Sequence, residues 1–250
     1  MAIADKLKAV ATNMERVYKA GFDAGKADGG GDDDYESIIW DAIQNKGARD
    51  NYNECFNYAS WNDENFRPKY SMRPIQSHVM FRNSSITDLV TPFESKGLVL
   101  DFSQSANTNQ LFSYSLIERV GVVDISTAHV SYCNPFQYAT KLHTVEKVIF
   151  ADKVYQNPFW LRDCYALVSI IAEGVIAMSI SLSHSSLLTI ESAKSFILCL
   201  KNYVGTDKEF ACTITFNPAT WELLDAEGET ASPNGNSWKT YIEDLGWLYM

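Results

Sequence analysis

The chain has 250 residues, enough to bury a sizeable core, and its 46% hydrophobic and 13% aromatic content excludes general disorder. Its formal charge is −10 and its Lys and Arg residues are scattered, which argues against a nucleic-acid-binding face. No apolar run approaches the length of a membrane span, and the N-terminus lacks the pattern of a secretory signal peptide. We therefore expect no membrane insertion, no nucleic-acid partner and synthesis in a cytoplasm.

Residues 1–27 predict a helix with a narrow apolar stripe. Apolar or small residues recur there at alternating spacings of four and three, as in the a/d seam of a coiled coil: Ile3, Leu7, Val10, Met14, Val17, Gly21 and Ala24. A single helix with so narrow a stripe is marginally stable in water. We expect it to form a homo-oligomer, with a trimer favoured, or to dock on a larger assembly. An amphipathic helix packed on its own domain is the alternative.

Two further segments precede the body of the protein. Residues 28–35 contain three consecutive Gly and three consecutive Asp residues, which predict a flexible acidic linker without the spacing of a calcium-binding loop. Residues 36–83 are rich in Asn, Tyr and Trp, and we interpret them as an aromatic-rich N-terminal cap over the end of the body. A platform for carbohydrate or for a partner protein is the alternative.

Residues 84–200 carry a pattern that returns at near-constant spacing. In each copy an aliphatic residue is followed three places later by another: Ile86 and Leu89, Ile117 and Val120, Leu142 and Val145, Leu167 and Ile170, and Leu187 and Ile190. The tripeptide Asn-Pro-Phe occurs in step with it at 134–136 and 157–159. Such self-similarity is typical of leucine-rich repeats. We expect strands at 98–102, 122–125, 148–150 and 178–182, and an internal column of Phe112, Phe136 and Phe159.

Residues 201–250 have a different character, and we interpret them as a C-terminal cap. A helical face precedes them at 190–200, and residues 212–216 alternate as a strand. Asn217 followed by Pro218 predicts the start of a helix that stops near Gly228. A second helix carries Trp238, Ile242 and Leu245 on one face, and the apolar residues 247–250 predict an edge strand.

The repeated unit resembles the BspA-like leucine-rich repeats, in which Phe-x-x-small and Leu-x-x-Ile/Val precede a strand. The clearest match is Phe136, Ala139, Leu142, Val145 and Val148. The Phe112 unit has one residue fewer before Ile117, and the Phe159 unit has two more before Leu167.

The whole layout also resembles small leucine-rich-repeat proteins encoded near tail genes in phages and prophages of gut Firmicutes. Residues 19–26, 40–49, 61–63 and 68–70 and the closing Trp-containing cap carry this likeness. It implies an α/β fold: a BspA-like leucine-rich-repeat solenoid with short parallel strands, an N-terminal coiled-coil helix and a helical C-terminal cap. It further implies a virion-associated or host-surface-binding protein. Because the N-terminus lacks a signal peptide, we expect a virion protein that is made in the host cytoplasm and released by lysis.

No motif predicts catalysis, a cofactor or a metal. The four His residues are far apart and lack metal-ligand spacing, and His143 lies inside a Leu-x-x-Val segment, where a structural role is expected. The five Cys residues are an odd number without a CxxC pair, which predicts reduced thiols. No nucleophile elbow or phosphate-binding glycine loop occurs. A glycosidase with acids distant in sequence is the alternative.

A binding surface is the better-supported expectation. The candidate ligand residues are Tyr114, Tyr132, Tyr138, Tyr155 and Trp160. If Tyr132 and Tyr155 face outward, they form with the other three a strip suited to glycans or protein partners. If they face inward they are core, and their equivalent places in successive units favour the core. We therefore expect a non-enzymatic phage virion protein of tail or fibre type. Its helix oligomerises or docks on the particle, and its solenoid binds a host-surface protein or glycan. The alternatives are a bacterial cell-surface or secreted BspA-like adhesin and a polysaccharide-degrading tail enzyme.

Overall fold

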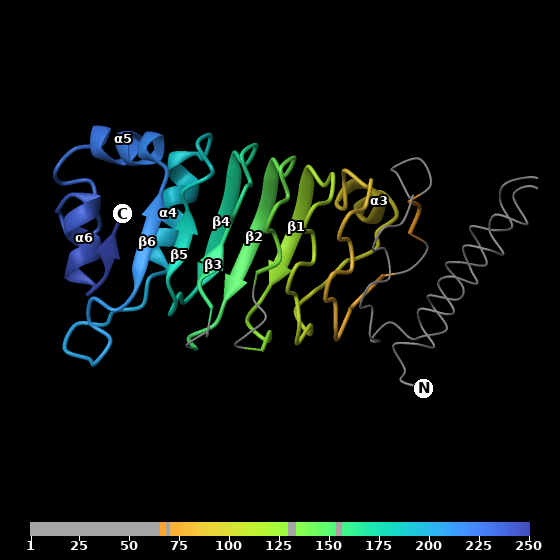
Figure 1. Cartoon of the computed structure of the whole chain (residues 1–250), viewed down its shortest axis with the longest axis horizontal. Coiled ribbons are helices and arrows are strands. Elements are labelled where there is room, and N and C mark those ends of the chain that lie inside the picture. The colour runs from red at the N-terminus through yellow and green to blue at the C-terminus, as the bar shows by residue number, and fades with distance from the viewer. Residues whose placement is uncertain (1–65, 69–70, 130–133, 154–156) are drawn as a thin grey trace, which may run out of the picture.

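The computed structural model describes residues 66–68, 71–129, 134–153 and 157–250. The predicted helix, the linker and most of the predicted aromatic cap lie outside these ranges. So do the residues expected to mediate oligomerisation or docking, namely Ile3, Leu7, Val10, Met14 and Val17. The described part has a mixed α/β fold with short parallel strands in two sheets. Its segments follow one another in chain order along the long axis of the molecule (Figure 1).

Both sheets contain parallel strands only. The first has the order β1-β2-β4, with β1 at Arg119–Asp124, β2 at Thr144–Phe150 and β4 at Ser169–Gly174. The second has the order β3-β5-β6-β7, with β3 at Phe159–Trp160, β5 at Ile180–Leu182, β6 at Thr213–Phe216 and β7 at Leu248–Tyr249. The described helices are α3 at Thr91–Glu94, α4 at Ile190–Leu198, α5 at Pro218–Ala226 and α6 at Trp238–Asp244.

The strands of the first sheet begin earlier than predicted. Strands β1 and β2 already include Val120 and Val145, and the expected strand at 98–102 is reduced to an isolated bridge from Leu100. Strand β4 was not predicted. In the second sheet, the expected strand at 178–182 overlaps β5. The physical reason is the burial pattern. In β1 the buried residues Val120 and Val123 are separated by the half-buried Gly121 and the exposed Val122, so strict alternation does not mark where the strand starts.

A row of phenylalanine rings lies at the centre of the core. Phe81 and Phe112 stack with their centroids 5.8 Å apart, and Phe112 and Phe136 stack at 5.5 Å, each pair within 15° of parallel. Phe159, expected to be the next ring, instead meets Phe136 edge-on at 6.4 Å. All four rings are fully buried. Part of the predicted column therefore exists, and it begins one segment earlier, at Phe81.

Leu161, rather than Phe159, occupies the next place in this row. The N–H of Tyr138 donates to the carbonyl of Arg162, and this parallel pairing sets Phe136 beside Leu161. The two residues that appear to be extra in the Phe159 unit therefore belong to β3, and from Leu161 onward the spacing is the same as in the Phe136 unit.

A small buried residue follows three places after each member of the row. Its N–H donates to the carbonyl three residues earlier and closes a turn that redirects the chain toward the first sheet. These residues are Ser84, Ser115, Ala139, Cys164 and Ser185. The aliphatic residues that come next are also buried, namely Ile86, Ile117, Leu142, Leu167 and Leu188.

The last of these residues corrects the predicted pattern by one position. Leu187 was expected in the core, yet 58% of its surface is exposed, whereas Leu188 is 2% exposed. Counting from the buried Leu182 restores the spacing of the preceding segments, because Ser185 and Leu188 follow at intervals of three.

Helix α4 takes the place of a further strand at the edge of the first sheet. The N–H groups of Ile170 and Ala172 point out of β4 with no neighbouring strand to receive them. The hydroxyl groups of Ser192 and Ser195 on α4 accept these hydrogen bonds at 3.1 and 2.9 Å. A sheet edge with unpaired donors can add a strand from another chain, and the helix prevents this.

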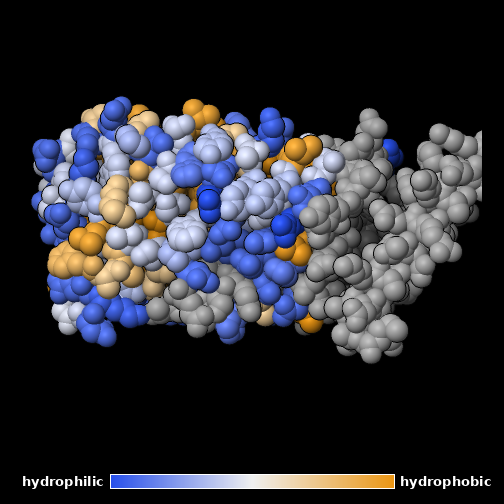
Figure 2. All heavy atoms as spheres, in the orientation of Figure 1, coloured by the Kyte–Doolittle hydropathy of each residue, from blue (hydrophilic) through white to orange (hydrophobic). Residues whose placement is uncertain are grey.

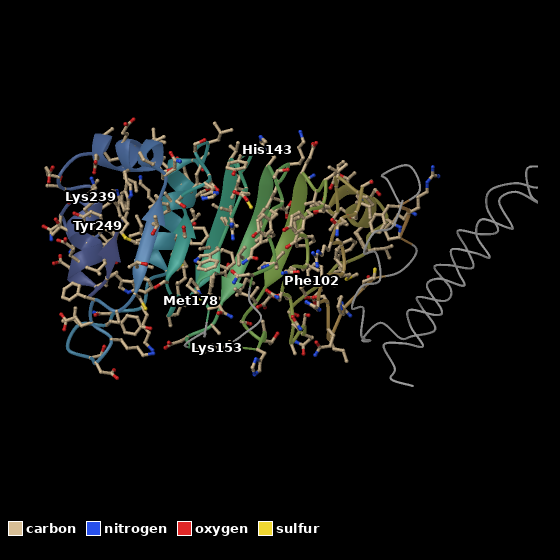
Figure 3. The ribbon with its side chains drawn as sticks, in the orientation of Figure 1. Phe102, His143, Lys153, Met178, Lys239 and Tyr249 are labelled. Atoms are coloured by element: carbon tan, nitrogen blue, oxygen red, sulfur yellow. The ribbon has the colours of Figure 1, made fainter. Side chains whose placement is uncertain are left out.

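The C-terminal elements form as predicted from their sequence. Thr189, Asn217 and Ser237 cap α4, α5 and α6 through side-chain oxygens. Trp247 is fully buried, and its indole N–H donates to the carbonyl of Lys201 at 2.7 Å. Figure 3 shows Lys239 and Tyr249 together at this end of the molecule, where the ammonium group lies 6.0 Å from the ring centroid.

On the face drawn in Figure 2, hydrophilic residues cover the middle strands, and hydrophobic ones gather toward the end that carries α6 and the C-terminus. Within the described ranges no helix is long and apolar enough to cross a membrane.

Candidate binding surface

A row of residues in the left-handed backbone conformation runs across successive segments. Each lies two places after a member of the buried row and has φ between 55° and 63°: Asn83, Tyr114, Tyr138 and Asp163. Asn and Asp tolerate this conformation, whereas for other side chains with a Cβ it is unfavourable by roughly 1–2 kcal/mol. The fold imposes this conformation at the same point of each segment, and Val79, Gln110 and Phe210 adopt it elsewhere, so the two tyrosines carry its cost because of their place in the turn.

The two tyrosines form the centre of a four-membered stack. The rings of Tyr114 and Tyr138 are 4.6 Å apart and within 8° of parallel. The guanidinium of Arg82 lies 5.4 Å from the first ring centroid, and that of Arg162 lies 5.1 Å from the second. We call these four residues the tyrosine stack. Its members come from segments that are adjacent in space, so the fold itself sets their spacing.

This arrangement determines which atoms a ligand can reach. The faces of the tyrosine rings are occupied by each other and by the guanidinium groups, so a ligand meets ring edges and phenolic hydroxyl groups. Tyr114 is 49% exposed. The guanidinium of Arg162 has no hydrogen-bond partner in the part of the chain that the structure describes, although its position is fixed by the ring of Tyr138. It is an ordered fork of N–H donors that faces solvent.

Asp163 organises the side chains next to the stack. Its Oδ1 accepts from the hydroxyl of Tyr165 at 2.5 Å and lies 2.7 Å from Nδ1 of His184. The rings of Tyr165 and His184 are stacked at 5.7 Å. The Tyr165 hydrogen bond, followed by that of His184, lowers the pKa of Asp163, and the same Tyr165 contact raises the pKa of that phenol. The carboxylate is therefore ionised at neutral pH, and its Oδ1 is engaged by these two exposed partners.

A surface hollow of about 240 Å³ adjoins the stack. It is lined by Trp160, Leu161, Arg162, Ser181, Ser183 and His184. Its floor comes from β3 and β5, which pair with Trp160 beside Ser181. We refer to it as the hollow. Arg162 belongs to both the hollow and the tyrosine stack, so the two features form one continuous surface.

Asn134 fixes the backbone that presents Trp160. Its buried side chain accepts from the N–H of Trp160 at 2.8 Å and donates to the carbonyl of Pro158 at 2.9 Å. The indole ring is 42% exposed and has no aromatic partner among the described residues. The Asn-Pro-Phe motif is therefore a structural device that holds the following segment in place, and one of its effects is to orient this tryptophan.

The outer face of the first sheet offers a contrast. Its charges are paired across the strands, Arg119 with Glu146 at 2.9 Å and Lys147 with Glu173 at 2.5 Å. These exposed pairs satisfy each other and leave few free donors. The donors of Arg162 are free by comparison, which distinguishes the two faces.

The sequence-predicted surface is partly described. Tyr114, Tyr138 and Trp160 lie on the surface outlined above, whereas Tyr132 and Tyr155 are outside the described residues. Sequence reasoning missed Arg82, Arg162 and the group around Asp163. The sequence did contain a usable pattern, because these residues stand one or two places after Phe81 and Leu161. That pattern is seen only when Leu161 is counted as a member of the buried row.

The residues considered for other chemistry have ordinary surroundings. His143 lies at the edge of the molecule where β2 begins (Figure 3), and its Nδ1 is 3.1 Å from the Thr144 hydroxyl. Burial raises the pKa of the Cys164 thiol to about 12 and also raises the pKa values of Cys199 and Cys212, which makes all three poor nucleophiles. In the described ranges no group of three His, Cys, Asp or Glu residues is arranged to hold a metal ion.

No protein-family description, curated protein or solved structure matches this chain. Its function is therefore inferred from the surface itself.

Proposed function

We propose that this chain is a non-enzymatic binding protein and that its parallel-stranded body is a leucine-rich-repeat solenoid of BspA-like type. The tyrosine stack with the adjoining hollow is its ligand-contact surface. The observation that carries this proposal is the pair of stacked tyrosines in the left-handed conformation, flanked by two arginines. Tyr and Arg are the residues that most often dominate binding interfaces. Their position at the surface, where Tyr114 is 49% exposed, supports a binding role.

The setting we propose is a phage particle. In this account the helix at 1–27 joins copies of the chain, as a trimer, or docks it on the virion, and the solenoid contacts a protein or glycan on the host surface. The support is the a/d spacing of the helix and the likeness in layout to small phage-encoded repeat proteins. A cell-surface or secreted adhesin of the same repeat type would use the same surface.

Binding is a better account of the hollow than glycoside hydrolysis. Glycosidases generally place two carboxyl groups about 5–9.5 Å apart across the bond they cleave. The side chains that line the hollow include no carboxyl group, and the nearby Asp163 is engaged by Tyr165 and His184. This observation supports a ligand-binding role for the surface over the polysaccharide-degrading alternative.

Two sets of measurements test the proposal, one of location and one of binding. Mass spectrometry of purified phage particles should detect the chain in stoichiometric amounts, and fractionation of the host should not place it in the cell wall. Fluorescently labelled chain should bind the surface of host cells and release no reducing sugars from their polysaccharide. Absence from particles would contradict the virion setting, and absence of cell binding would contradict the binding role. Release of sugars would favour the enzyme.

A further inference from the structure

The guanidinium of Arg162 is positioned to bind an anionic ligand. It is held against the ring of Tyr138, which in turn rests on Tyr114, so little side-chain entropy remains to be lost on binding. The flat fork of N–H donors matches a carboxylate, which it can bind through two parallel hydrogen bonds. The adjacent carboxylate of Asp163 interacts with Arg162 through charge, but its Oδ1 is engaged by Tyr165 and His184, and in the described structure no hydrogen bond joins it to the guanidinium.

The other walls of the hollow suit a sugar ring. Trp160 supplies an exposed indole with no aromatic partner among the described residues, and such a face packs well against the C–H groups of a pyranose. Ser181 and Ser183 contribute hydroxyl groups, which lie 3.1 Å from each other and retain capacity for further hydrogen bonds. Nδ1 of His184 is engaged by Asp163, through the Oδ1 carboxylate oxygen and the backbone N–H, which leaves Nε2 to form a hydrogen bond with a ligand hydroxyl.

Size limits the ligand to one ring at a time. The hollow measures about 240 Å³, below the roughly 300–1,000 Å³ of pockets that enclose drug-sized molecules. It is also open to the tyrosine stack, so a polymer that places one ring in the hollow can continue over the edges and hydroxyl groups of Tyr138 and Tyr114. The surface therefore fits a chain of sugars better than a free monosaccharide.

We propose that the hollow is a subsite for an acidic sugar, a pyranose ring that carries a carboxylate, within a cell-surface polysaccharide. Arg162 binds the carboxylate, Trp160 packs against the ring, and Ser181, Ser183 and His184 contact its hydroxyl groups. This inference rests on the proposed binding function and specifies its ligand class. Because the chain carries a net charge of −10, recognition depends on these short-range contacts and not on long-range attraction.

The test uses the full chain and a pair of polymers that differ only in their carboxyl groups. Polygalacturonate presents free carboxylates, and its methyl-esterified form presents the same backbone without charge. Affinity electrophoresis or calorimetry should show binding to polygalacturonate at least 10-fold tighter than to the ester. The variants Trp160→Ala and Arg162→Gln should each weaken binding to the acid at least 10-fold. Arg119→Gln, on the outer face of the first sheet, should leave it unchanged.

The outcomes separate this inference from the proposed function. Equal binding of acid and ester, no binding of polygalacturonate, or undiminished binding by Arg162→Gln would each overturn the acidic-sugar subsite. Poly-glutamate that competes as well as polygalacturonate would show that the sugar ring is not recognised. If labelled chain still binds host cells in any of these cases, the proposed function stands and only the ligand class fails. Circular dichroism of each variant confirms that the fold is retained.

Discussion

Single residues on the candidate surface are held in place at a measurable conformational cost. Tyr114 and Tyr138 adopt φ values of 58° and 63°, which are unfavourable for side chains other than Gly, Asn and Asp. Stacking of the two rings returns about 0.5–1.5 kcal/mol. Substitution by Asn removes the stack but relieves the backbone, so the two effects offset each other. This makes Tyr→Asn variants a clean way to remove the surface without damaging the fold.

Gly174, where β4 ends, should be intolerant of any side chain. Its φ is +89°, and an added Cβ would come within 2.1 Å of the carbonyl oxygen of Phe150 on the neighbouring strand. We expect Gly174→Ala to lower the free energy of unfolding by about 3 kcal/mol or more. Gly205→Ala is the matched control, because φ is +73° there and nothing lies within 4 Å, so only the backbone cost of about 1 kcal/mol applies. Urea unfolding measures both, and equal losses would contradict the close approach.

The contact between Asp163 and Tyr165 should contribute to stability within a defined pH window. The lowered pKa of Asp163 means that its contribution is complete above its ordinary value of 3.8 and is lost as the pH falls through the lowered value. The raised pKa of Tyr165 means that its contribution is complete below its ordinary value of 10.0 and is lost as the pH rises through the raised value. In Asp163→Asn the phenol should titrate closer to 10.0, which NMR can follow. A Tyr165 pKa that is the same in both proteins would argue against the hydrogen bond.

At the level of elements, the position of each buried side chain is set by hydrogen bonding between adjacent segments. The parallel pairing of Tyr138 with Asp163 fixes Leu161 beside Phe136 and brings Arg162 to the stack. The turn after each buried Phe or Leu needs a small residue, and Cys164 meets this need as Ala139 does. The surface thus follows from the same register that orders the core.

The corrected register predicts a large loss of stability for substitution of one of two adjacent leucines and almost none for the other. Leu188 is 2% exposed and lies in the row of buried aliphatic residues, so Leu188→Ala should cost about 2–5 kcal/mol of unfolding free energy. Leu187 is 58% exposed, and Leu187→Ala should change stability by no more than about 0.5 kcal/mol. Thermal or urea denaturation of the pair decides the matter. A larger loss for Leu187→Ala than for Leu188→Ala would mean that the segment is shifted by one residue.

Sequence patterns identified the core more readily than the surface. The Leu-x-x-Val spacing located buried residues such as Leu142 and Val145, because tight packing constrains size and polarity at every copy. Leu161 was missed because it replaces a Phe, and the Asn-Pro-Phe motif two residues earlier drew the alignment away from it. Arg162, the next residue along the chain, was overlooked for the same reason. The pairing of Asp163 with His184 depends on register between segments, which a single sequence does not show.

At the scale of the whole molecule, the described body is a stack of segments whose end elements differ from the middle. Helix α4 receives the edge donors of β4, and α5 and α6 follow beyond it at the C-terminal end (Figure 1). The middle segments, which lie between these end elements, therefore carry exposed side chains at regular spacing. A regular surface of this kind suits an extended ligand and gains affinity when several copies act together.

Removal of residues 1–27 should convert an oligomer into a folded monomer. The a/d spacing predicts that these residues join the chains, and among the described residues a hydrophobic core runs from Phe66 to Trp247. Analytical ultracentrifugation should give a trimer for the full chain and a monomer for the truncated chain, with unchanged near-ultraviolet circular dichroism. A full chain that sediments as a monomer would exclude self-association and leave docking as the role of the helix.

We expect the double variant Tyr114→Asn/Tyr138→Asn to lose cell binding, because it removes the tyrosine stack from the proposed binding surface. Flow cytometry with labelled chain should show at least a 10-fold loss of binding to host cells relative to the wild type. The free energy of unfolding should change by no more than about 1 kcal/mol. A folded double variant that binds cells as well as the wild type would contradict the account.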